Sequence, residues 1–165
     1  MLVAAALPGI PEVRAGDDLG ALLVAAAGTP AGGDVLVVAH KIVSKAEGRT
    51  IALADVQPGA LATQLAAEHG KDPRLVEVIL GETEQIVRSR PGVLICRTRH
   101  GFVCANAGVD ASNAGTEGEL VLLPHDADAS ARALRAGMRA VAGIAPAIVI
   151  ADSFGRAWRV GQCDV

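Results

Sequence analysis

The chain has 165 residues, with 18 acidic against 15 basic side chains and a formal net charge of −3. A chain of this length can bury about two thirds of its unfolded surface, in one compact domain or in one large and one small lobe. The chain lacks the basic stripe that binding to a phosphate backbone requires, and its 2% aromatic content argues against base stacking, so nucleic acid is excluded as a partner.

The N-terminal residues are predicted to form a strand, a turn and a helix. Residues 2–7 are an apolar run of strand length. The turn Pro8-Gly9-Ile10-Pro11 follows, in which prolines fix φ and Gly9 lets a ligand approach the backbone. Asp17 and Asp18 are predicted to cap a helix over 19–27.

Polar residues crowd the end of the apolar run 35–39, which is predicted to be a strand covered on both faces. Ligands of α/β proteins tend to lie at that end of a strand. Lys41 and Lys45 are four apart, so in a helix both could face one point and hold polyphosphate or carboxylate. A solvated surface pair is the alternative, since no glycine-rich phosphate loop precedes them. His40, taken singly, is more often a hydrogen-bonded histidine than a base.

The middle of the chain is predicted to be scaffold. Leucine spacing indicates helices over 58–69 and 73–80. Alternation indicates strands around 85–88 and 92–96, and the second can pair with 101–104 as a hairpin. The remaining predicted elements are a strand over 119–124, a helix that opens at 126–130 with Arg132, Arg135 and Arg139 on its outer face, and a strand over 147–150.

Two predicted strands end in oxygen-rich loops. Asp110 and Asn113 follow the 101–104 strand, and Asp152 and Ser153 follow the last strand. Magnesium needs few protein carboxylates, because it keeps waters and takes other ligands from substrate phosphates. These two loops and the lysine pair would make a cation-plus-phosphate site if they meet in space. The alternative is that each aspartate bonds its own loop backbone.

The cysteines and the lengths of the apolar runs indicate the cellular compartment in which the protein is expected. Cys96, Cys104 and Cys163 show no metal-binding or redox spacing, so they are interpreted as small apolar core residues in a reducing cytoplasm. No apolar stretch approaches the roughly 20 residues that cross a bilayer, and Met1–Leu7 lacks the positive flank of a targeting segment. We therefore expect a soluble, cytoplasmic protein without a membrane partner.

Three long segments together resemble a known family. They are His40-Lys-Ile-Val-Ser-Lys-Ala-Glu-Gly-Arg49, Gly101-Phe-Val-Cys-Ala-Asn-Ala-Gly-Val-Asp-Ala-Ser-Asn113 and Asp152-Ser-Phe-Gly-Arg-Ala-Trp-Arg-Val-Gly-Gln162. They resemble the coenzyme F420:L-glutamate ligases, also called F420-0:gamma-glutamyl ligases, and the likeness runs from about Gly9 to the last residue. The resemblance implies an α/β fold of mixed sheets with flanking helices, formed by a single ligase-like domain over 1–165 that lacks the family's usual C-terminal part.

The resemblance also implies a reaction. Members of the family use GTP to join L-glutamate to a carboxylate of the deazaflavin coenzyme precursor, then extend a gamma-linked glutamate tail and release GDP and phosphate. A free carboxylate must first be made electrophilic, most simply as an acyl phosphate. The implied cations are Mg²⁺ or Mn²⁺, two of them, with K⁺ a further candidate, and the implied assembly is a homodimer.

Carried over residue by residue, the resemblance assigns roles. Asp110 and Asp152 look like ligands of the first metal and Ser153 like a ligand of the second, while Asn113 looks like a nucleotide contact. Lys45, Asp110 and Asp152 would carry the catalysis. The other segments that match GTP contacts are Pro8, Gly9, Ile10 and Pro11 together with His40, Lys41 and Lys45.

Family members run on beyond the position of Val165, in a glycine-rich part that resembles a second source of nucleotide and metal ligands. This leaves an alternative function, a truncated and catalytically inactive module that binds nucleotide, metal or precursor. A third possibility is another metal-dependent phosphoryl-transfer or phosphatase activity that uses the same two aspartates.

Overall fold

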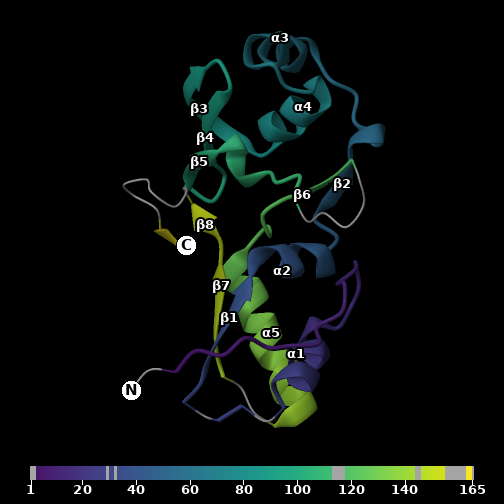
Figure 1. Ribbon diagram of the computed structural model, residues 1–165, viewed down its shortest axis with the longest axis vertical. Coiled ribbons are helices and arrows are strands. Elements are labelled where there is room, and N and C mark those ends of the chain that lie inside the picture. The colour runs from purple at the N-terminus through teal and green to yellow at the C-terminus, as the bar shows by residue number, and fades with distance from the viewer. Residues whose placement is uncertain are drawn as a thin grey trace. The chain divides into compact units, whose positions relative to one another are not determined.

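The structure is a computed structural model that describes residues 3–28, 30–31, 33–112, 118–143, 146–154 and 163–164, the last four of these in backbone only. It confirms the predicted α/β fold of small mixed sheets with flanking helices (Figure 1). The chain divides into two compact units. The first comprises Met1–Gly48, Pro124–Asp152 and Asp164–Val165, and the second comprises Arg49–Leu123 and Ser153–Cys163.

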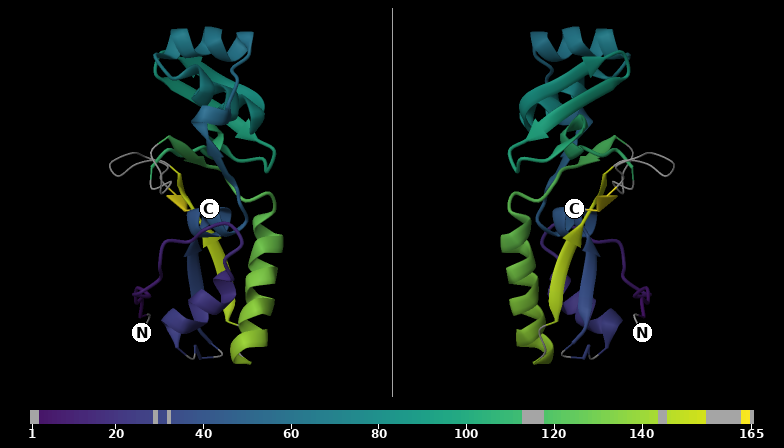
Figure 2. Two further views of the ribbon diagram at one scale, coloured as in Figure 1. Left: turned by 90° about the vertical axis from the view of Figure 1, so that its right-hand side faces the viewer. Right: turned by 90° about the vertical axis from the view of Figure 1, so that its left-hand side faces the viewer.

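The first unit is built on two parallel strands. Strand β1 (Val35–Ala39) pairs with β7 (Ala147–Ala151), so that Ala39 lies opposite Ala151 at the carboxyl ends. Helices α1 (Leu19–Ala27) and α5 (Ala127–Ala142) pack against each other, and α5 also runs along β7 (Figures 1 and 2). Helix α2 (His40–Ala46) follows β1 without a break. The buried residues of this core are Val13, Leu19, Leu23, Val38, Val43 and Met138.

The caps of the predicted helices are confirmed. Asp18 Oδ1 accepts a hydrogen bond from Ala21 N at 3.0 Å, and α1 ends at Gly28. Asp126 Oδ1 accepts from Ala129 N at 2.8 Å at the start of α5. Each carboxylate satisfies a backbone donor that the first helical turn leaves without an intrahelical partner.

Two predictions for the first unit are wrong. Residues 3–7 form no strand, because no strand among the described residues pairs with their backbone groups, and most of their side chains are exposed. The run over 35–39 is a strand, but it is not covered on both faces. Val35 is 59% and Val37 63% exposed, whereas Val38 is 2% exposed. Within the described residues the helices cover one face of the β1–β7 pair, so burial alternates along the strand.

The second unit contains the two helices and the β-hairpin that are predicted for the middle of the chain. Helices α3 (Ala60–His69) and α4 (Pro73–Gly81) pack together, close to the bounds predicted for them (Figure 1). Strands β3 (Thr83–Arg90), β4 (Val93–Thr98) and β5 (Val103–Ala105) form an antiparallel sheet in that order. Elsewhere in the chain are the short strands β2 (Thr50–Ala52), β6 (Glu119–Val121), β8 (Ser153–Phe154) and β9 (Cys163–Asp164), of which β2 pairs with β6 and β8 with β9.

The core of the second unit joins α4 to the sheet. It contains Val78, Ile79, Leu94, Cys96, Leu120 and Leu122. Cys96 and Cys104 lie opposite each other on β4 and β5 as buried cysteines outside any disulfide, which confirms their interpretation as core residues. Cys163 has no described side chain. Among the helices in the described part of the chain, none has both the length and the apolar character needed to cross a membrane.

Candidate functional site

The carboxyl ends of β1 and β7 bring two of the predicted site residues together. His40 follows Ala39 and Asp152 follows Ala151, and these two alanines are partners in the parallel register. His40 Nδ1 lies 3.3 Å from Asp152 Oδ1, within reach of an ion pair when the imidazole is protonated. The His40 side chain is 5% exposed and that of Asp152 27%. A group that the resemblance assigns to the nucleotide thus contacts one that it assigns to a metal.

Helix α2, which begins at His40, also carries Lys41 and Lys45. The segment is helical, as the lysine spacing required, and Lys45 lies in its last turn. The Lys45 side chain is 10% exposed, and its Nζ lies 2.5 Å from Glu12 Oε1. Lys45 is therefore not a solvated surface lysine, which was the alternative for that residue. Lys41 is half-buried on the same helix.

The main chain is accessible in the turn that precedes Glu12. Pro8 to Pro11 form no helix or strand, and Gly9 has a φ of +81°. A Cβ built on Gly9 would meet nothing within 4 Å, so a ligand has access to this stretch of main chain. Ile10 packs against the core of the first unit, which anchors the turn there.

Asp110, in the second unit, is fixed by hydrogen bonds to neighbouring residues. Its backbone exchanges hydrogen bonds with Val121, at 3.0 and 2.8 Å. Its Oδ1 accepts from Ser112 N at 2.6 Å, the pattern of an Asx turn. Asp110 therefore makes one contact of the alternative kind, in which an aspartate bonds the backbone of its own loop.

A left-handed turn positions Asp110. Asn106, Ala107 and Gly108 have φ angles of +54°, +54° and +74°. Alanine is rarely found in this region, and such backbone costs about 1–2 kcal/mol per residue unless it is glycine. Val109 N donates to Asn106 O at 3.0 Å and closes the turn. Strain of this size persists only where the surrounding packing enforces it, so the backbone entering Asp110 is rigidly set.

Several predicted site residues stay predictions. Asp110 lies in the second unit and Asp152 in the first, so their meeting around a metal is not tested. Asn113 lies outside the described residues, as does the side chain of Ser153. Within the described ranges no group of three or more His, Cys, Asp or Glu side chains gathers as a metal site. The two carboxylates still fit Mg²⁺ or Mn²⁺, because these hard cations take one or two protein carboxylates and complete their shells with water and phosphate oxygens.

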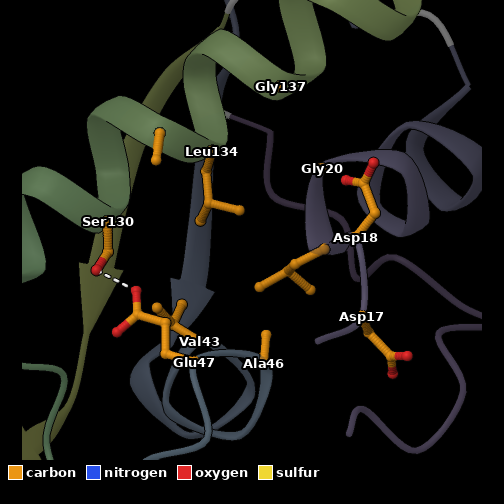
Figure 3. A pocket seen from close by; sticks show the side chains of 11 residues that line it. Asp17, Asp18, Gly20, Val43, Ala46, Glu47, Ser130, Leu134 and Gly137 are labelled. Atoms are coloured by element: carbon orange, nitrogen blue, oxygen red, sulfur yellow. Dashed lines mark hydrogen bonds between the residues drawn. The ribbon is translucent and has the colours of Figure 1, made fainter. Parts of the chain in front are cut away.

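Sequence reasoning did not find a cavity of about 230 Å³ among α1, α2 and α5 (Figure 3). Its three carboxylates are already engaged. Asp17 accepts from Arg14 N, Asp18 accepts from Ala21 N, and Glu47 accepts from the Ser130 hydroxyl, toward which it points in Figure 3. The floor is formed by side chains such as Val43 and Leu134. The cavity is a gap between packed helices, and its acidic groups are held by a helix cap, a turn and a side-chain hydrogen bond.

The chain is similar to proteins of one family. Residues 9–165 match the family described as F420-0:Gamma-glutamyl ligase. A coenzyme F420:L-glutamate ligase of Methanopyrus kandleri is 50% identical over 154 residues, which cover 93% of this chain and 60% of that protein. The proteins of the same name in Methanothermobacter thermautotrophicus and Haloarcula marismortui are 42% and 41% identical over 161 and 163 residues. These matches cover 95% of this chain in both cases, and 64% and 62% of the relatives. The chain thus spans somewhat less than two thirds of the length of these relatives.

Proposed function

Since this chain belongs to the F420-0:gamma-glutamyl ligase family, we propose that it is a GTP-dependent ligase that adds L-glutamate to the deazaflavin coenzyme F420 precursor. The relatives are named coenzyme F420:L-glutamate ligases, which supports glutamate as the group added. The first addition forms an amide, and later additions form gamma-glutamyl links. A homodimer remains the expected assembly.

The proposed reaction passes through an activated carboxylate. The precursor carboxylate attacks the γ-phosphorus of GTP, the bond to the β-γ bridging oxygen breaks, and GDP leaves. The glutamate amino group then attacks the acyl carbon of the mixed anhydride, loses a proton and displaces inorganic phosphate. An amine cannot displace oxide from a free carboxylate, so the nucleotide is spent to provide a leaving group. Charge builds on the transferred phosphoryl group, and positioned cations stabilise it.

The residues at the ends of β1 and β7 fit this chemistry. Lys45 would neutralise phosphate charge with a mostly buried ammonium, and the open backbone at Pro8 to Pro11 would approach the nucleotide. His40 and Lys41 stand beside Lys45 on the same helix. Asp110, Asp152 and Ser153 would hold Mg²⁺ or Mn²⁺, which supplies further charge neutralisation at the phosphates when bound. Asn113 would contact the nucleotide.

One observation carries the proposal most strongly. His40 and Asp152, from two separate family motifs, meet at 3.3 Å where parallel strands end. That edge is where α/β sheets bind ligands. This contact supports the proposal, in which His40 belongs to the nucleotide segment and Asp152 to the metal segment.

The test is turnover with matched variants. Purified chain is incubated with GTP, Mg²⁺, L-glutamate and precursor, and the product is sought by mass. Asp152→Asn should abolish glutamate addition, because it removes the charge that holds the metal. Asp55→Asn makes the same chemical change on an exposed residue of the second unit and should leave addition intact. Equal activity of wild type and Asp152→Asn would refute the assigned role.

A second candidate function has its own supporting observation. More than a third of each relative has no counterpart in these 165 residues. If the remaining ligands of the nucleotide and metal lie there, this chain would bind nucleotide or precursor without turnover. Calorimetry separates the two candidates, because the binding module binds GTP with Mg²⁺ yet forms no GDP. Absence of both binding and turnover would remove both.

A further inference from the structure

The ion pair between Lys45 and Glu12 is asymmetric in its contact with water. Lys45 Nζ lies 2.5 Å from Glu12 Oε1, but the lysine side chain is 10% exposed and the glutamate side chain 61%. A mostly buried ammonium needs a counter-charge, since burying an unpaired charge is costly. An exposed carboxylate, by contrast, is readily solvated again when the pair opens. The pair therefore opens from the Glu12 side.

The backbone that carries Glu12 is anchored, while its side chain is not. Val13 is 4% exposed, and Ile10 packs against the same core. Gly16 N donates to Ala46 O at 2.9 Å, which ties the segment to the end of α2. Glu12 can thus leave Lys45 by rotating about its own side-chain bonds, without any movement of the main chain.

The position of Glu12 links it to the nucleotide segment. It directly follows Pro8 to Pro11, the open turn assigned to GTP, and its carboxylate sits on the lysine assigned to the same ligand. A phosphate oxygen that binds Lys45 at this point would occupy the space and accept the hydrogen bond that Glu12 Oε1 takes. Two anionic groups cannot both lie against one buried ammonium without mutual repulsion.

We propose that Glu12 is a placeholder counter-ion, which holds the Lys45 ammonium in the nucleotide-free chain and swings into water when a nucleotide phosphate takes its place. This inference rests on the proposed function, in which Lys45 contacts GTP. Glu12 is then a competitor of the phosphate, and it keeps the buried ammonium paired between turnovers. If Glu12 instead stayed in place and oriented Lys45 toward the phosphate, its removal would have the opposite effect on affinity.

The experiment measures nucleotide affinity by calorimetry in wild type and in Glu12→Gln, with Glu12→Ala as a second variant. Losing one competing charge-assisted contact should tighten binding of GTP with Mg²⁺ by about threefold to tenfold. Inorganic pyrophosphate should show the same gain, while guanosine, which has no phosphate, should show none. The matched control is Glu84→Gln, which removes the same charge and breaks a different ion pair, with Arg97 at 3.0 Å. It should not change GTP affinity.

The outcomes separate this inference from the proposed function. If wild type and Glu12→Gln bind GTP equally, or if Glu12→Gln binds GTP more weakly, the placeholder role is overturned and the ligase proposal stands. If neither binds GTP, the nucleotide part of the ligase proposal fails. The affinity for pyrophosphate then decides the role of Glu12. Tighter binding of pyrophosphate by Glu12→Gln than by wild type supports the placeholder role, and equal or absent binding overturns it.

Discussion

Replacing Gly108 with alanine should strongly destabilise the second unit, because the glycine has no room for a side chain. A Cβ on Gly108 would lie 2.8 Å from Leu123 Cδ1 and 2.9 Å from Leu123 Cγ. Leu123 is 6% exposed and so cannot simply move into solvent. In addition, the φ of +74° is a conformation that alanine adopts at a cost.

The two effects can be estimated separately. The left-handed backbone costs about 1–2 kcal/mol for a residue with a Cβ. Forcing an extra methyl group into packed side chains costs about 1–3 kcal/mol. The free energy of unfolding of Gly108→Ala should therefore fall by roughly 2–5 kcal/mol.

Gly92→Ala is the matched control. Gly92 has a φ of +77°, but a Cβ there meets nothing within 4 Å. The free energy of unfolding of Gly92→Ala should thus fall only by the cost of the left-handed backbone, about 1–2 kcal/mol. Urea unfolding followed by circular dichroism measures both variants, provided that the slope of free energy against urea is unchanged. If the two variants lie within about 0.5 kcal/mol of each other, the contact between Gly108 and Leu123 is not as described.

Three further predictions concern charge and burial. Hydrogen bonds from Arg74 lower the pKa of Asp72 from 3.8 to about 2, so Asp72 stabilises the fold above the unfolded pKa and loses that contribution as pH falls through about 2. The difference in unfolding free energy between wild type and Asp72→Asn should shrink from pH 4 to pH 2, and a constant difference would contradict the assignment. Arg49 NH2 lies 2.8 Å from Glu82 Oε2 with both side chains largely buried, so Glu82→Gln should cost about 3 kcal/mol in urea unfolding by removing the counter-charge of the guanidinium. A loss no larger than that of an exposed pair such as Arg97–Glu84 would show that Arg49 finds another partner. Burial raises the pKa of the Cys96 thiol, so iodoacetamide at neutral pH should label Cys96 only after unfolding, as followed by peptide mass. Labelling of Cys96 in the native protein would contradict its buried position.

The elements that sequence predicted well are those set by local chemistry. Helix α1 begins after Asp18 and is followed by Gly28, because a carboxylate cap and a C-terminal glycine each act on the backbone within a few residues of their own position. The apolar run 35–39 was correctly predicted as a strand. Its burial was not, since exposure depends on which elements cover each face. Residues 3–7 show the same limit, because an apolar run becomes a strand only where another strand pairs with it.

The contacts of the candidate site were beyond sequence reasoning. His40 and Asp152 were each assigned from separate motifs, but their contact depends on β1 and β7 being parallel neighbours far apart in the chain. Lys45 was singled out by its spacing, whereas nothing in the spacing pointed to Glu12 as its partner. Ala107 in the left-handed region could not be predicted either, because alanine disfavours that backbone and only tertiary packing enforces it.

Glutamate addition coupled to GTP tests the central proposal most directly. Purified chain is supplied with the deazaflavin precursor, L-glutamate, Mg²⁺ and GTP, and product mass and GDP are measured over time. The ligase proposal predicts a product heavier by one glutamate residue for each GDP formed, and no product without GTP. Glutamate addition that proceeds without GTP, or GDP formation that leaves the precursor unchanged, would contradict it.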